Sequence, residues 1–221
     1  MLEPFRDRHD AGRLLATKLG QQFKDLSDVL VLGLPRGGVV VAYEVALAIN
    51  AELDVFVVRK LGTPFQPELA MGAIAEGGML LLNDAVVNYL SISHETIEDI
   101  AKKELIELQR REKLYRNSRP APVISDRTVI VVDDGLATGA SMKVAVRALK
   151  RKKPSKLIVA APVGAPSSCI DMQDEVDQVL CLKTPEPFNA VGSWYEQFDQ
   201  TTDEEVKSLL QSAYEQKKRA A

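Results

Sequence analysis

Short runs of consecutive apolar residues alternate with longer stretches of helical periodicity along this chain. Five apolar runs predict strands, at residues 28–34, 53–59, 127–133, 156–162 and 176–182. The runs are continuous rather than alternating, as in strands that are covered on both faces. Residues 38–50 and 139–152 lie between such runs and predict crossover helices. This order predicts an α/β fold with a doubly wound, mainly parallel sheet.

Residues 61–122 interrupt this order as an insertion. The segment "AMGAIAEGGMLLLND" predicts a hairpin that turns at Gly77 and Gly78, with Glu76 at its tip, and we expect it to form part of a mobile cover. A long helix is predicted from Glu95 to Arg116, with an apolar stripe to be buried on the sheet or on a second subunit. The stripe consists of Ile97, Ile100, Ala101, Leu105 and Leu108. The charged side of the helix, with Arg110, Arg111 and Arg116, is expected to be solvated.

Composition places the chain among ordinary globular proteins. It has 221 residues, of which 46% are hydrophobic and 27% charged, and its net charge is −3. The basic clusters at residues 150–156 and 217–219 are local, so we expect solvated helix ends and no nucleic-acid partner. The N-terminal segment is charged, and no apolar stretch approaches the length of a membrane span. We therefore expect no membrane partner and a cytoplasmic location.

Neither the histidines nor the cysteines form a metal-binding or redox motif. His9 and His94 lie far apart in the sequence, so a zinc site is not expected. Cys169 and Cys181 form no CxxC motif, and two cysteines in a chain of this length do not make a disulfide framework. We expect them to be small buried thiols in a reducing compartment.

The stretch "VIVVDDGLATGAS", residues 129–141, ends a predicted strand on two carboxylates and continues in small residues. In an open α/β sheet, ligands bind beyond the carboxyl ends of the strands. Unpaired backbone N–H groups at the start of a helix attract an anion, and Thr138 and Ser141 add hydroxyl donors. The stretch therefore predicts a phosphate-binding loop beside Asp133 and Asp134.

The two carboxylates repel phosphate and need another partner on the same ligand. Vicinal sugar hydroxyls can donate to them, so a phosphorylated ribose suits both the loop and the acids. A strand-end turn with an N-capping acid is the simpler alternative, and it accounts for one aspartate but not for two. The stretch matches neither the GxxxxGK[ST] phosphate loop nor the GxGxxG dinucleotide fingerprint.

All thirteen positions resemble the phosphoribosyl-pyrophosphate (PRPP) signature of the type I phosphoribosyltransferases. By this resemblance, Asp133 and Asp134 hold the ribose hydroxyls and take part in magnesium binding through water. The 5′-phosphate-binding residues implied are Gly135, Leu136, Ala137, Thr138, Gly139, Ala140 and Ser141. Members that act on 6-oxopurines carry an aspartate at the position of Ala137, and this departure leaves the base unidentified.

A second segment, "GLPRGG", follows the first predicted strand and opens a helix. The resemblance implies pyrophosphate binding by this loop, and Arg36 offers a fork suited to phosphate oxygens. Arg59 and Lys60 end the next predicted strand, where the family carries basic charge near the diphosphate. The simpler alternatives are a Pro-Gly turn with a solvated arginine and an exposed strand end. The implied pyrophosphate-binding residues are Pro35, Arg36, Gly37, Gly38, Arg59 and Lys60, and Arg36 and Lys60 would join the acid pair in catalysis.

The insertion and the tail also resemble parts of the family. The insertion takes the place of a flexible loop that excludes water from the activated sugar. The tail from residue 185 takes the place of a small C-terminal hood over the base, and its candidate base-binding residues are Phe188, Trp194 and Tyr195. Packing of these aromatics in the core of the hood is an equal alternative. The whole pattern is most similar to a bacterial group of phosphoribosyltransferases without an assigned substrate.

The resemblance implies one phosphoribosyltransferase domain over residues 1–221, with the insertion at about 61–122 and the hood at about 185–221. Such an enzyme transfers 5-phosphoribosyl from PRPP to a nitrogen base, releases pyrophosphate and uses Mg²⁺. The alternative is a regulatory protein that binds PRPP or a nucleotide without turnover. The expected partners are these small molecules, and because the family is often dimeric, a homodimer.

Overall fold

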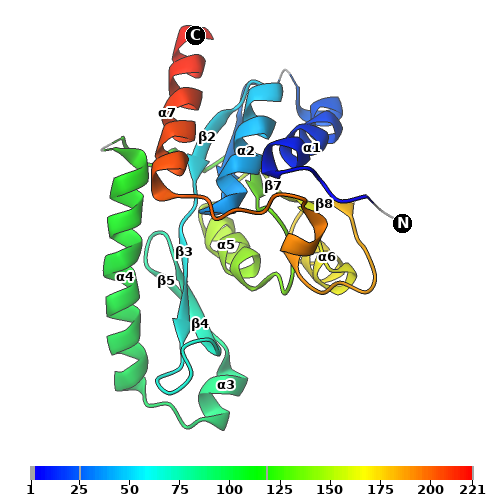
Figure 1. Cartoon of the computed structure of the whole chain (residues 1–221). Helices are drawn as coiled ribbons and strands as arrows, with labels where there is room; N and C mark the ends of the chain where they lie inside the picture. Colours follow the sequence, from blue (N-terminus) through cyan, green and yellow to red (C-terminus); the bar gives the residue numbers. More distant parts are fainter. Residues whose placement is uncertain (1–2, 25, 118, 221) are drawn as a thin grey trace.

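The centre of the molecule is a five-stranded sheet with the order β2-β1-β6-β7-β8 (Figure 1). A computed structural model describes residues 3–24, 26–117 and 119–220. Every neighbouring pair in this sheet is parallel, which confirms the predicted α/β fold. The strands are β1 (Val29–Gly33), β2 (Glu52–Val55), β6 (Thr128–Val132), β7 (Lys156–Val163) and β8 (Gln178–Lys183).

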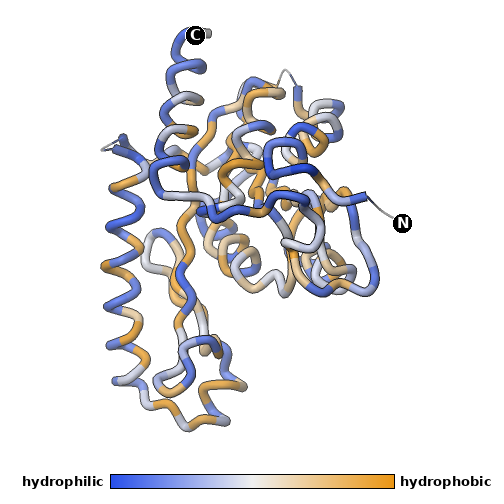
Figure 2. The backbone as a smooth tube through the Cα atoms, viewed as in Figure 1, coloured by the Kyte–Doolittle hydropathy of each residue, from blue (hydrophilic) through white to orange (hydrophobic). Residues whose placement is uncertain are grey.

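Helices cover both faces of this sheet. One face packs against α1 (Arg8–Phe23), α2 (Gly37–Ala48) and α7 (Asp203–Ala220), and the other against α5 (Ala140–Arg151) and α6 (Pro166–Gln173). Val31 enters the first core and its neighbour Leu32 the second, because successive side chains of a strand point to opposite faces. Apolar residues therefore concentrate in the central strands (Figure 2), and each strand is a continuous apolar run.

The insertion forms a second sheet of three antiparallel strands, β3 (Val58–Gly62), β4 (Ala70–Ala75) and β5 (Met79–Leu82), in that order. The predicted hairpin joins β4 to β5, and Gly77 and Gly78 adopt φ values of +86° and +77°, which favour glycine. The turn points back toward the main sheet, since the Glu76 amide donates to the Val57 carbonyl at 3.0 Å. Glu76, expected at a mobile tip, is instead buried, with 7% of its surface exposed.

The predicted strand at residues 53–59 is divided between the two sheets. Its first half is β2, an edge strand of the parallel sheet, and its second half begins β3. Phe56 and Val57 lie between the two strands and are 1% exposed. The apolar run does not reveal the break, because the chain stays buried while it changes partners.

The helix α4 (His94–Arg116) packs along the second sheet and also contacts α7 (Figure 1). It starts at Ser93, whose side chain accepts from the Thr96 amide, and ends at Asn117, which is left-handed. The predicted stripe is buried within the same chain: Ile97 and Leu108 join the first core, with the other three stripe residues packed against it. The stripe therefore does not need a second subunit to cover it. A short helix, α3 (Asp84–Tyr89), precedes α4.

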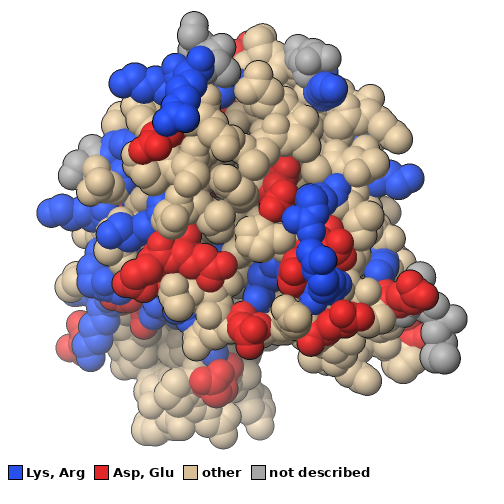
Figure 3. Space-filling view, turned by 45° about the horizontal axis from the view of Figure 1, so that its top comes forward, with Lys and Arg blue, Asp and Glu red and all other residues tan. Residues whose placement is uncertain are grey.

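The tail divides into two parts. A short 3-10 helix, η1 (Val191–Trp194), lies with the N-terminal segment, whereas α7 packs on α2, α4 and β2. On the face drawn in Figure 3, Lys and Arg are interspersed with Asp and Glu. Within the described ranges, no helix is both long and apolar enough to cross a membrane.

Candidate functional site

Two loops leave the carboxyl ends of β1 and β6 side by side. Gly33 and Val132 are paired in the sheet register, and the Leu34 amide donates to the Val132 carbonyl at 2.9 Å. A Cβ atom built on Gly37 would lie 1.9 Å from Asp134 Oδ2, and one on Gly38 would lie 2.8 Å from the Asp133 Cα atom. The "PRGG" segment therefore packs directly on the acid pair, and only glycine leaves room for this approach. The Pro35–Arg36 peptide bond is cis.

The acid pair is half-buried and only partly satisfied. Asp133 Oδ1 accepts from the Asp134 amide at 2.9 Å, and Asp134 Oδ2 accepts from Arg8 Nε at 2.7 Å. The second oxygen of each carboxylate has no hydrogen bond to any residue that the structure describes. Burial and the neighbouring Asp134 charge raise the pKa of Asp133 well above its ordinary value, and burial also raises the pKa of Asp134, although Arg8 opposes it. Two carboxylate oxygens thus remain available for donors on a ligand.

Leu136 holds the small-residue loop by backbone hydrogen bonds in both directions. The Leu136 amide donates to the Val163 carbonyl at 2.9 Å, and the Leu136 carbonyl accepts from Ala165 at 2.8 Å. Gly139, at φ +67°, caps α5. The amides of Ala137, Thr138, Gly139 and Ser141 have no backbone partner among the described residues. Free amides at a helix N-terminus can bind an anion, and phosphate binding by this loop stays a prediction.

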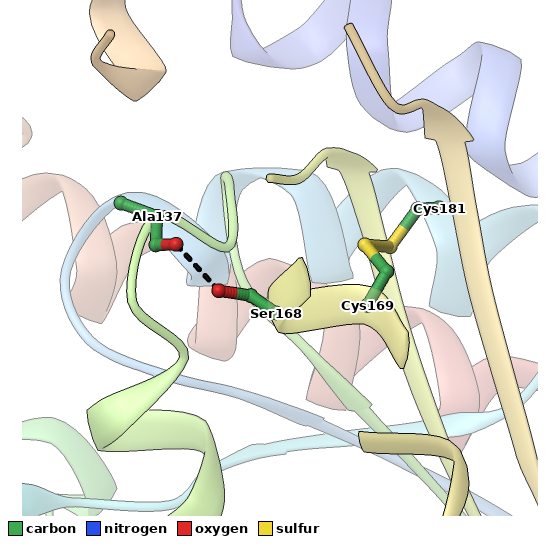
Figure 4. Close-up of a disulfide and its surroundings, with 4 residues drawn as sticks. All are labelled: Ala137, Ser168, Cys169 and Cys181. Atoms are coloured by element: carbon green, nitrogen blue, oxygen red, sulfur yellow. Dashed lines mark hydrogen bonds between the residues drawn. A yellow bond between two sulfur atoms is a disulfide. The ribbon is translucent and has the colours of Figure 1, made fainter. Parts of the chain in front are cut away.

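Helix α6 supports this loop from the side. Ser168 Oγ donates to the Ala137 carbonyl at 2.6 Å (Figure 4). Ser168 is 5% exposed, so its hydroxyl is held in place. The contact holds the Ala137 carbonyl, while the amides of residues 137–139 have no backbone partner in the described chain.

The expectation of two free thiols is wrong. Cys169 and Cys181 form a disulfide that joins α6 to β8 (Figure 4). A Cβ atom on Gly164 would lie 2.5 Å from the Cys169 sulfur and 3.3 Å from Leu136 Cβ, so the disulfide packs next to the phosphate loop. The spacing of 12 residues carries no motif, and only the fold brings the two sulfurs together.

The predicted pyrophosphate-binding cations differ in what holds them. Arg36 lies at the N-terminus of α2, where its side chain makes no capping hydrogen bond. Arg59 Nη2 lies 2.7 Å from Glu104 Oε2 of α4, and Lys60 Nζ lies 3.1 Å from Glu68 Oε2. Arg59, Lys60 and Glu104 line a groove of about 630 Å³, and Glu68 lies in the loop between β3 and β4. Of the three predicted pyrophosphate-binding cations, only Arg36 belongs to the glycine loop that packs on the acid pair.

The three candidate base-binding aromatics pack together with Phe5. Tyr195 is 6% exposed, and its ring lies 5.5 Å from that of Phe5 and 4.9 Å from that of Phe198. Its hydroxyl donates to the Asp134 carbonyl at 2.6 Å, so Tyr195 supports the acid pair and does not offer its ring to a base. Phe188 and Trp194 are half-buried at the edge of this cluster, and their contact with a base stays a prediction.

The insertion is fastened to the main sheet by buried charges. Arg116 Nε lies 2.8 Å from Asp54 Oδ2 of β2, and Arg116 Nη2 lies 2.8 Å from Glu76 Oε2 at the hairpin turn. All three residues are 7% exposed, so the expectation of a solvated Arg116 is wrong. Arg110 and Arg111 instead pair with Glu107 on their own helix. The hairpin turn is therefore an anchored end of the insertion.

Two residues that contact the site, Arg8 and Ser168, are not predicted from the sequence. Arg8 is 126 positions from Asp134, and Ser168 is 31 positions from Ala137. Asp7 before Arg8 is a visible N-cap signal, because its side chain accepts from the Asp10 amide. That signal predicts the start of a helix and says nothing of what Arg8 contacts.

The donor set suits a magnesium ion that is shared with a substrate. Asp133 and Asp134 each leave one carboxylate oxygen without a partner in the described chain, and Mg²⁺ takes one or two carboxylates together with water and phosphate oxygens. Across the described ranges, no three His, Cys, Asp or Glu side chains gather as a metal site. The other ligands of such an ion would come from water and the substrate.

The parallel sheet, the acid pair and the phosphate loop define a type I phosphoribosyltransferase fold. The chain belongs to the phosphoribosyl transferase family, whose domain model matches residues 5–199. This confirms the resemblance that residues 129–141 carry.

The names of the curated relatives agree with this family and print no substrate. A Mycobacterium tuberculosis protein is 46% identical over 210 residues. Its name gives it as a candidate phosphoribosyl transferase and states no substrate. These cover 95% of this chain and 47% of that protein, so the chain spans about half the length of the curated relatives it matches. TT1426 from Thermus thermophilus is 42% identical with a TM-score of 0.80, and the match covers 95% of this chain and 98% of that one. AQ2163 from Aquifex aeolicus, 12% identical with a TM-score of 0.50, shares the fold over 84% of this chain and 78% of its own.

Proposed function

We propose that this protein transfers 5-phosphoribosyl from PRPP to a nitrogen nucleophile and releases pyrophosphate. The observation that carries the proposal is the close packing of Gly37 and Gly38 on the acid pair. A Cβ atom added to Gly37 would lie 1.9 Å from Asp134 Oδ2, and one added to Gly38 would lie 2.8 Å from the Asp133 Cα atom. This packing puts a glycine loop, two carboxylates and a free-amide loop into one site. Each part matches one part of PRPP: diphosphate, ribose hydroxyls and 5′-phosphate.

The side chains would position the substrate and stabilise its charge. The amides of residues 137–141 bind the 5′-phosphate, and Asp133 and Asp134 accept hydrogen bonds from the ribose hydroxyls. Arg36 binds the diphosphate and stabilises the charge that develops on it. The C1–O bond breaks and pyrophosphate leaves with the electron pair. The nitrogen lone pair then forms the new bond to C1, and the nitrogen loses its proton.

Magnesium would be held through water by Asp133 and Asp134 and would supply positive charge for the diphosphate. Replacing both by asparagine removes the negative charge that retains the ion, while the side chains keep their size. The loop amides are not altered by this replacement.

Calorimetric titration with PRPP and magnesium tests the proposal. Wild type is expected to bind PRPP at or below millimolar concentration, and Asp133→Asn/Asp134→Asn is expected to bind at least tenfold more weakly. Asp126→Asn, a change in the turn before β6, serves as the matched control and should bind as wild type does. Absence of wild-type binding, or equal binding by the double variant, would contradict the proposal.

Turnover is a separate question from binding. A PRPP-binding regulator would retain the same site without releasing pyrophosphate. A pyrophosphate-release assay over purines, pyrimidines, orotate and other nitrogen nucleophiles distinguishes the two functions. Release with any nucleophile supports the transferase, whereas binding without release over the whole panel supports the regulator.

A further inference from the structure

Arg8, at the start of α1, reaches the acid pair from the N-terminal segment. Its Nε donates to Asp134 Oδ2 at 2.7 Å, and its Nη1 donates to the Asp199 carbonyl at 2.6 Å. Its guanidinium carbon lies 3.8 Å from the centre of the Phe198 ring. Three contacts from two distant segments therefore fix the position of one side chain.

The ion pair with Asp134 differs from an ordinary surface pair. The side chains of Arg8 and Asp134 are 12% and 17% exposed. Exposed pairs contribute little because water screens them and both side chains lose freedom, but a pair held from several sides keeps its geometry. The pair also lies against the glycine loop, since a Cβ atom on Gly37 would be 2.7 Å from Arg8 Nε. Arg8 is thus part of the surface on which PRPP would bind.

The orientation of Asp134 follows from these contacts. Oδ2 faces Arg8, and the Asp134 carbonyl accepts from the Tyr195 hydroxyl, so both the side chain and the backbone of Asp134 are held. Oδ1 is left without a partner in the described chain. Without Arg8, the Asp134 carboxylate could rotate, and its free oxygen would no longer be held in one position.

We propose that Arg8 is a positioning residue for PRPP: it holds Asp134 so that the free carboxylate oxygen accepts from a ribose hydroxyl. The inference rests on the proposed function and adds to it a residue from outside the two signature loops. The inference predicts different effects on the binding of two ligands at this site, PRPP and inorganic phosphate. PRPP has ribose hydroxyls for Asp134, whereas inorganic phosphate occupies only the loop at residues 137–141.

The experiment compares three variants of the 221-residue chain with wild type. Arg8→Gln removes the charge and the fork, Arg8→Lys keeps the charge, and Arg6→Gln is the matched control, because Arg6 is 61% exposed and pairs with Asp7 on the same segment. Binding of magnesium–PRPP is measured by calorimetry. Binding of inorganic phosphate is followed by the NMR shifts of the amides of residues 137–141.

We expect Arg8→Gln to bind PRPP at least tenfold more weakly, Arg8→Lys to recover part of this loss, and Arg6→Gln to stay within twofold of wild type. Phosphate binding should be the same in all four proteins. Equal PRPP binding by Arg8→Gln, or an equal loss of phosphate and PRPP binding, overturns the inference, because the second result indicates a purely structural role. If Arg8→Gln does not fold, Arg8→Lys decides by the same two measurements. If wild type binds phosphate but no PRPP, the proposed function itself fails and the inference fails with it.

Discussion

The phosphate loop and the base of the insertion use polar groups in opposite ways. On the loop, the amides of residues 137–139 have no backbone partner in the described chain, and its anchors come from Leu136 and Ser168 at its sides. At the base of the insertion, Arg116 is buried between Asp54 and Glu76 and satisfies both. The loop leaves its polar groups for a ligand, whereas the insertion uses them to hold itself to the sheet.

This difference distinguishes a ligand site from an anchor. Unpaired polar groups at the accessible end of a sheet are poorly satisfied until a ligand arrives. A buried charge cluster with short contacts on every side is already satisfied, and removing one member leaves the others unpaired in a dry environment. Substitutions at the loop should therefore change binding more than stability, and substitutions at the anchor should do the reverse.

The largest effect on stability is expected from Arg116→Met. The substitution keeps much of the side-chain volume but leaves Asp54 and Glu76 buried without their cation, both at 2.8 Å in wild type. We expect the free energy of unfolding to fall by about 3–5 kcal/mol, measured by urea denaturation. Arg110→Met on the same helix is the control, since its side chain is 54% exposed and should leave the unfolding midpoint unchanged. Similar losses in both variants would mean that Arg116 is not an anchor.

A smaller loss of stability is expected when the Cys169–Cys181 disulfide beside the phosphate loop is removed. Cys169→Ala/Cys181→Ala opens a loop between residues 12 apart, and closing a loop of this size stabilises a protein by about 2–3 kcal/mol. We expect that loss in urea unfolding, and reductant should lower the stability of wild type but not of the double variant. If reductant leaves wild-type unfolding unchanged, the disulfide does not contribute to stability.

The two regions also differ in how far the sequence predicts them. Residues 129–141 are contiguous and carry their own strand, acids and loop, so the local sequence suffices to predict the strand, the loop and the start of the helix. The anchor joins Asp54 of β2, Glu76 of the β4–β5 turn and Arg116 of α4, which are far apart in the sequence. A charged residue on a predicted helix is usually solvated, and only tertiary packing reverses this for Arg116.

Long-range packing also explains the other errors. The Cys169–Cys181 pairing and the Arg8 contact with Asp134 join segments that have no shared pattern in the sequence. The break in the predicted strand at residues 53–59 is hidden, because Phe56 is buried between two sheets. The hydrogen bond from the Tyr195 hydroxyl to the Asp134 carbonyl joins two distant segments, and residue type alone does not reveal it.

The smallest effect concerns Glu112, which adds a pH-sensitive charge to the anchor. Burial and the nearby Glu76 raise the pKa of Glu112 to about 7, against the opposing charges of Arg116 and Lys152. Since the pKa is lower in the unfolded chain, the folded protein binds the extra proton, and this contribution to stability is lost as the pH rises from about 4.5 through 7. As the pH rises from 5 to 8, the free energy of unfolding of Glu112→Gln should therefore increase relative to that of wild type by about 1 kcal/mol, an amount reduced by solvent screening.

Glu107→Gln is the control on the same helix. Hydrogen bonds from Arg110 and Arg111 lower the pKa of Glu107 to about 2, so that its charge is constant over this range. Urea unfolding at both pH values measures the difference, and an equal pH dependence in the two variants would remove Glu112 from the anchor.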